Sequence, residues 1–195
     1  DLFAGHVASN RARLEYRAVI GERLGHLAIQ RPRALTTEGA PMFDRAEAGR
    51  IRRIVEARPG IALVLPQMSL SGMASAGERS ALFHGEGIDA EGPPDAPGKL
   101  NASVRNGIAV SIGQARSLGL RNGSNVTLNG AAADRQGKPL SAEVVDIFST
   151  AGLSSDARSV LMPFELAQTL LDTQRTERLV VFLSDPDQLE EQRDE

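Results

Sequence analysis

The feature that most constrains this 195-residue chain is the segment at residues 107–130, GIAVSIGQARSLGLRNGSNVTLNG. Gly107–Val110 can form a strand, and Ser111 with Gln114 has the spacing of a capping box that begins a helix. Gly119 is placed to end that helix in the left-handed conformation. The letters RNGS then form a turn with positive-φ residues, followed by the alternating strand NVTLN. The segment therefore predicts a strand, a short capped helix, a tight turn and a second strand.

The chain on either side of this segment carries α/β patterns. Before it, LGHLAIQ indicates a strand, a helix begins at the N-cap Asp44 and ends before Pro59, and IALVLPQMSLSGM is extended. A looser helical pattern occupies residues 1–23. After it, RSVLMP indicates a strand, an apolar stripe follows at helical spacing, and RLVVFLS is a buried strand. Pro186 is placed to begin one more helix.

These patterns predict the domain organisation. Hairpins dominate between about Arg79 and Phe148, whereas strands and helices alternate at both ends. We therefore expect an α+β fold, in which an α/β body is formed by residues 1–77 and 156–195. A β-rich subdomain, residues 78–155, is inserted between the two halves of that body.

Composition excludes whole classes of function. The 22 basic residues are outnumbered by 25 acidic ones, and the chain has no Trp and one Tyr. Nucleic-acid binders need a basic field and often aromatic platforms, so no nucleic-acid partner is expected. Cysteine is absent, which excludes disulfides, thiolate metal sites and cysteine nucleophiles. The absence of thiols also fits an oxidising compartment such as a periplasm.

Motifs for catalysis are missing from the sequence. The three histidines, His6, His26 and His84, have no metal-binding spacing, and there is neither a G-x-S-x-G elbow nor a phosphate-binding glycine loop. We expect no catalytic, cofactor-binding or metal-ligating residue, and no cofactor. A hydrolase that uses His26 or His84 is kept as a minor alternative.

One stretch is a candidate contact surface. PQMSLSGM places Met68 and Leu70 on one face of an extended segment and Met73 on the other. Methionine side chains adapt to variable apolar ligands, so these three residues are the candidate substrate contacts. Core packing explains the same residues and is the favoured interpretation.

The order of the motifs along the chain resembles one family. The series GHLAIQ, FHGEGIDAEGPP, GIAVSIGQARSLGLRNGSNVTL, AEVVDIFSTAGLSSDARSVLMPFELAQTLL and RLVVFLSDPDQL is similar to the periplasmic domain of ABC transporter permeases of the lipoprotein-releasing and macrolide-exporter type. The likeness runs from about residue 14 to residue 190. Two loops depart from it. Ser124 stands where an acidic residue is common, and the proline that usually follows Gly87, Ile88 and Asp89 is displaced. Neither loop carries a catalytic residue in the family.

The resemblance implies a function without chemistry. It implies a porter-like body with a β-rich insertion, in which the segment at residues 107–130 is scaffolding. Membrane helices would continue from both ends of the chain, and the two termini would lie close together at one end of an elongated molecule. The domain would face the periplasm from a bacterial inner membrane. A cytoplasmic ABC ATPase would drive it, a second permease subunit would pair with it, and a lipoprotein, peptide or small molecule would be its substrate.

One alternative comes from another class of protein. ARSLGLRNGSNVTLNG also resembles the helix-to-hairpin signature of double-psi barrels, which implies a ligand- or nucleotide-binding module. The α/β segments on both sides of this signature favour the transporter domain over a free-standing module.

Overall fold

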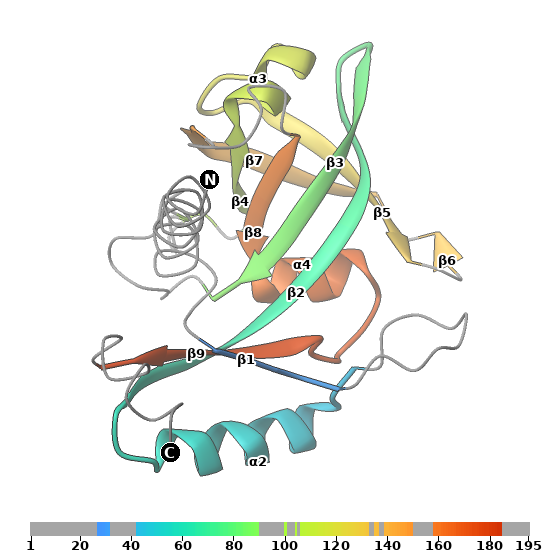
Figure 1. Ribbon diagram of the computed structural model, residues 1–195. Helices are drawn as coiled ribbons and strands as arrows, with labels where there is room; N and C mark the ends of the chain where they lie inside the picture. Colours follow the sequence, from blue (N-terminus) through green and yellow to red (C-terminus); the bar gives the residue numbers. More distant parts are fainter. Residues whose placement is uncertain are drawn as a thin grey trace, which may run out of the picture.

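The computed structural model describes residues 27–31, 42–89, 100, 104, 106–132, 135–136, 139–149 and 158–184. The described helices are α2 (Arg45–Glu56), α3 (Ile112–Leu118) and α4 (Phe164–Leu170). Nine strands belong to one mixed sheet (Figure 1): β1 (Leu27–Gln30), β2 (Ile61–Ala76), β3 (Arg79–Ile88), β4 (Gly107–Ser111), β5 (Asn125–Ala132), β6 (Arg135–Gln136), β7 (Leu140–Phe148), β8 (Ser159–Pro163) and β9 (Arg178–Leu183). The predicted α+β class is confirmed.

Local sequence signals form the predicted elements. The backbone N–H of Glu47 donates to Asp44 Oδ1 over 2.8 Å, so Asp44 caps α2 as expected. Gly119 ends α3 at φ 68°, and Gly123 lies in the following turn at φ 82°. IALVLPQMSLSGM forms part of one continuous strand, β2. The helices predicted at residues 1–23 and after Pro186, and the expected proximity of the termini, lie outside the described residues.

Six of the strands close on themselves. They follow the order β2-β3-β8-β4-β7-β5, and β5 pairs back onto β2. The main hydrophobic core fills this closed sheet, and its largest fully buried side chains include Phe83, Ile108 and Leu128. The closed sheet forms the upper part of the molecule in Figure 1, with α3 at its top and α4 below it. It takes β2 and β8 from outside residues 78–155, and the predicted domain boundaries stay a prediction.

The closed sheet is built from two similar halves in tandem, β2-β3-β4-α3 and β5-β7-β8-α4. Exchanging β2 with β5, β3 with β7 and β4 with β8 leaves every pairing and its direction unchanged. The helices correspond as well, since Ala115 and Leu118 in α3 match Ala167 and Leu170 in α4, and all four are buried. The six strands of the closed sheet therefore have an approximate two-fold axis that passes between β4 and β8.

A smaller part lies below the closed sheet. Strand β9 pairs with β1 on one edge and with the first half of β2 on the other. Helix α2 covers one face of these strands (Figure 1), where Ile51 and Val55 pack on Val64, Leu179 and Val181. Strand β2 continues from this part into the closed sheet and thus connects the two.

Candidate functional site

The three predicted contact residues do not share one surface. Met68 and Leu70 point into the closed sheet and are 0% and 7% exposed, whereas Met73 points outward and is 44% exposed. Side chains alternate along a strand, so the odd spacing from Leu70 to Met73 puts them on opposite faces. Core packing, the favoured interpretation, accounts for Met68 and Leu70. Of the three residues, Met73 is the one whose side chain is exposed to a substrate, and its contact with a substrate stays a prediction.

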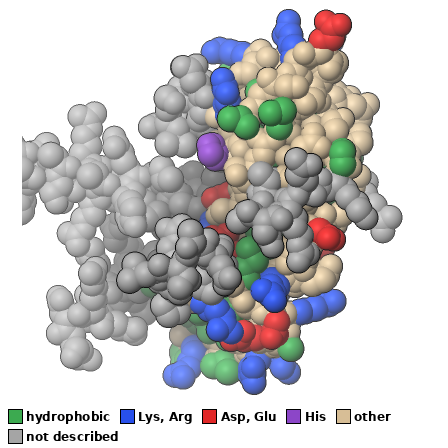
Figure 2. All heavy atoms as spheres, turned by 90° about the vertical axis from the view of Figure 1, so that its right-hand side faces the viewer, with side chains coloured by type: hydrophobic (Ala, Val, Ile, Leu, Met, Phe, Trp, Pro, Cys, Tyr) green, Lys and Arg blue, Asp and Glu red, His purple; other side chains and the backbone are tan. Residues whose placement is uncertain are grey.

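Met73 belongs to an uncharged outer face. Its partner across the β2–β3 ladder is Leu82, which is 60% exposed. About 25–35% of a typical designed soluble surface is charged. The outward side chains on the neighbouring segments of β2, β3 and β5 are instead uncharged. They are Ser69, Ser71, Met73 and Ser75 on β2, Ser80, Leu82 and His84 on β3, and Asn125, Thr127 and Asn129 on β5. We call these residues the neutral face. Hydrophobic side chains gather near a histidine on the upper half of the surface in Figure 2. Sequence reasoning missed Leu82, although its place opposite Met73 follows from the hairpin turn at Gly77.

The N-terminus of α3 is already occupied by the chain itself. Ser111 Oγ accepts hydrogen bonds from the backbone N–H groups of Gln114, at 3.2 Å, and Ser159, at 3.1 Å. The first bond confirms half of the predicted capping box. The other half is absent, because the amide of Gln114 is fully buried and neither its nitrogen nor its oxygen has a partner. The backbone N–H of Gln114 is therefore not free to bind an anion at this helix start.

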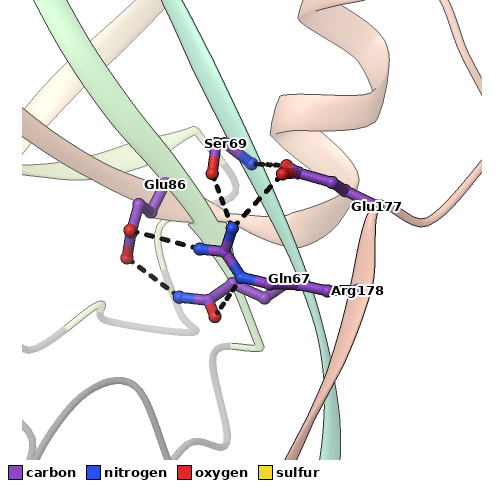
Figure 3. Close-up of polar contacts among 5 residues, drawn as sticks. All are labelled: Gln67, Ser69, Glu86, Glu177 and Arg178. Atoms are coloured by element: carbon purple, nitrogen blue, oxygen red, sulfur yellow. Dashed lines mark hydrogen bonds and ion pairs between the residues drawn. The ribbon is translucent and has the colours of Figure 1, made fainter. Parts of the chain in front are cut away.

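A polar cluster lies where β2 passes from the smaller part into the closed sheet (Figure 3). Arg178, at the start of β9, is its centre. The guanidinium Nε donates to Gln67 Oε1 at 3.0 Å, and Nη1 donates to Ser69 Oγ at 2.8 Å. Nη2 lies 3.3 Å from Glu86 Oε1 on β3, and Nη1 lies 3.3 Å from Glu177 Oε1. Gln67 Nε2 also donates to Glu86 Oε2 at 2.9 Å. The side chain of Arg178 on β9 therefore contacts residues of both β2 and β3.

The cluster is partly shielded from water. The side chains of Arg178, Glu177 and Glu86 are 17%, 19% and 31% exposed, and Gln67 is buried. Glu177 also accepts a hydrogen bond from the backbone N–H of Ser69. Charge-assisted hydrogen bonds with restricted access to water are stronger than exposed ones, because solvent competes less for each group. Sequence reasoning did not identify any member of this cluster.

The described residues show no arrangement typical of a catalytic or metal centre. Of the three histidines, only His84 lies in the described part of the chain, and it is exposed on the outer face of β3. No three His, Asp or Glu side chains within the described ranges are placed to hold a metal ion. None of the described helices is long and apolar enough to cross a membrane.

Comparison with solved structures gives likenesses over most of the chain. The extracellular domain of the ABC-type transporter YknZ from Gram-positive bacteria matches with a TM-score of 0.56 and 17% identity, covering 84% of this chain and 86% of that one. The periplasmic region of MacB from Actinobacillus actinomycetemcomitans matches with a TM-score of 0.57 and 14% identity, covering 85% and 78%. No protein-family model matches the chain, and no curated protein matches it by sequence.

These likenesses concern the fold. At 14–17% identity they show that the chain folds as the extracytoplasmic domains of two ABC-type transporters do. Both matches extend through the smaller part and the closed sheet, since each covers more than four fifths of the chain. The fold implied by the order of the sequence motifs is therefore confirmed.

Proposed function

We propose that the chain is the extracytoplasmic domain of an ABC transporter permease. The observation that carries this proposal is the shared fold with two such domains over 84% and 85% of the chain. The order of the sequence motifs supports it independently, because that order resembles the same class of domain. Function does not follow from fold alone, so each element of the proposal needs its own support.

The role proposed for the domain is mechanical. ATP is hydrolysed by a cytoplasmic ABC ATPase, and the motion of the membrane helices reaches this domain through its two chain ends. Strand β2 runs through both the smaller part and the closed sheet, so it is the connection proposed to carry a displacement of one part to the other. The domain works beside a second permease subunit on the periplasmic side of a bacterial inner membrane. It has no catalytic step of its own.

The neutral face is the surface proposed to meet the substrate. Met73 and Leu82 are ladder partners on it, and charged side chains border the face at Glu86, opposite Ser69, and at Glu143, opposite Asn125. A charged ligand centred on Met73 and Leu82 would lose hydration there, whereas an apolar one would gain by burial. We therefore propose a lipoprotein, a peptide or a small hydrophobic molecule as the substrate, in agreement with the resemblance of the sequence.

Labelling in intact cells tests the proposed location. These 195 residues contain no cysteine, so Met73→Cys introduces a single exposed thiol into this domain. A membrane-impermeant maleimide is expected to label Met73→Cys in intact spheroplasts. Met68→Cys is the matched control, because Met68 is 0% exposed and stays unlabelled until the protein is denatured. Labelling of Met73→Cys only after lysis would refute the proposed location.

A second candidate function rests on the closure of the six strands. A closed six-stranded sheet with two strand–helix units is compatible with a ligand-binding module related to double-psi barrels. A thermal-shift titration with ATP, GTP and NAD separates the two candidates. A saturable rise in melting temperature would favour the binding module, and the transporter proposal predicts no shift with any of the three nucleotides.

A further inference from the structure

Strand β2 has an interruption in its ladder pairing between the two parts of the molecule. On one edge it pairs with β9 as far as Gln67 and with β5 from Ser71 onward, which leaves residues 68–70 without a strand partner on that edge among the described pairings. The hydrophobic clusters divide at the same place. Leu65 belongs to a cluster of the smaller part, and Met68 to the main core. We call residues 67–70 the joint.

The gap in the ladder is filled by side chains. Ser69 lies in its middle, and its backbone N–H donates to the carboxylate of Glu177 in place of a strand neighbour. Gln67 is the one described residue of β2 whose ladder partners come from both β3 and β9, namely Ile88 and Arg178. An unpaired backbone N–H group is costly unless water or a side chain bonds it, so Glu177 stabilises the joint in this geometry.

We infer that Arg178 is the positioning residue that locks the joint, fixing the orientation of the smaller part relative to the closed sheet. It extends from β9, which belongs to the smaller part alone, and reaches Glu86 on β3, which belongs to the closed sheet alone. Gln67 and Ser69 of β2 are held between them. The inference deepens the proposed function, because a locked joint passes force between the two parts.

Arginine suits this position better than any other cation. All three guanidinium nitrogens are used, on four different acceptor residues, so the planar group fixes direction as well as distance. A lysine has one nitrogen and cannot reach acceptors on both sides of the joint in the same way. Without a cation, the carboxylates of Glu86 and Glu177 lose the group that they share and repel each other. Arg178→Met is therefore expected to free the joint.

Pulsed electron resonance (double electron–electron resonance) measures the effect directly in this cysteine-free chain. A label pair at Arg50→Cys on α2 and Glu78→Cys at the β2–β3 turn spans the joint, and both sites are exposed. With Arg178 present, we expect one narrow distance distribution. In Arg178→Met the single narrow peak should be lost, and in Arg178→Lys the distribution should be broadened to an intermediate extent.

A second label pair separates positioning from general stability. Glu78→Cys with Arg116→Cys on α3 lies wholly within the closed sheet and its helix, so its distribution should not change in Arg178→Met. Arg121→Met, at an exposed turn, is the matched control and should leave both pairs unchanged. Broadening of both pairs, or an unchanged distribution across the joint, would overturn the inference. If Arg178→Met fails to fold, Arg178→Lys decides by the same criteria.

The test needs neither ATP nor a membrane, so its failure leaves the proposed function standing. The absence of ATP-linked movement in the full-length transporter would remove the proposed function and leave the locked joint intact.

Discussion

Replacing Gln114 by leucine is expected to stabilise the protein. Gln114 is 0% exposed and its two amide atoms have no hydrogen-bond partner. The approximate two-fold axis gives its counterpart, because Gln114 in α3 corresponds to Leu166 in α4, as Ala115 corresponds to Ala167. Leu166 is 6% exposed. The same structural position therefore holds an unbonded amide in one half of the closed sheet and an apolar side chain in the other.

The expected magnitude follows from the missing bonds. A buried polar group without a partner costs about 1–3 kcal/mol. Gln114→Leu removes that cost with a side chain of similar size, so the free energy of unfolding should rise by about 1–3 kcal/mol. For a domain of this size each kcal/mol corresponds to about 2–4 °C in melting temperature.

Urea unfolding followed by circular dichroism measures this change, and the midpoint should rise at an unchanged m-value. The reciprocal variant Leu166→Gln is the matched control. It buries an amide and loses apolar contact, so its free energy of unfolding should fall by about 2–4 kcal/mol. A fall in stability for Gln114→Leu would show that the amide of Gln114 makes bonds in the folded protein, and would refute the reasoning.

The remaining predictions concern close packing, a helix cap and the neutral face. A Cβ at Gly72 would lie 2.1 Å from a backbone oxygen of β5, so Gly72→Ala should lower the urea midpoint by an amount equivalent to about 1–3 kcal/mol or more. Gly49→Ala meets no atom within 4 Å on the exposed side of α2 and should instead add about 0.5–1 kcal/mol in the same assay. Asp44→Ala removes the α2 cap and should cost about 1 kcal/mol, measured by thermal unfolding; an unchanged melting temperature would contradict the assigned cap. The double variant Met73→Ser with Leu82→Ser should shift the melting temperature by no more than about 4 °C, since exposed substitutions cost little, but should reduce export activity in cells; undiminished export would exclude the neutral face as the substrate surface.

Local signals allowed the helices and strands to be predicted. Asp44 and Gly119 act within a few residues of their own positions, so the sequence alone indicates the beginning of α2 and the end of α3. Alternation along a strand likewise separates Met73 from Leu70. The prediction that the side chain of Gln114 completes the capping box is wrong, because the spacing from Ser111 is a local signal. The burial that leaves the amide of Gln114 unbonded depends instead on the rest of the core.

The closed sheet and the polar cluster depend on contacts between distant residues. Arg178 is 111 residues from Gln67, and nothing in the local sequence of either residue indicates the other. The two halves of the closed sheet share an order of elements, but α3 and α4 have the same residue at only two of seven equivalent positions, and Gln114 corresponds to Leu166. The pairing of β5 with β2 closes the sheet, and it joins residues more than 50 positions apart, such as Ser71 and Ala131. No local sequence signal indicates this pairing.

The central claim is that this domain moves when a coupled ATPase works. The protein with its membrane segments, carrying one spin label per domain at Glu78→Cys and reconstituted in lipid nanodiscs with its ATPase partner, tests this most directly through the distance between the labels of two such domains. The distance distribution between the two domains of one transporter should shift when ATP is trapped on a hydrolysis-deficient ATPase, and should return after the nucleotide is removed. Identical distributions with and without trapped ATP would contradict the claim.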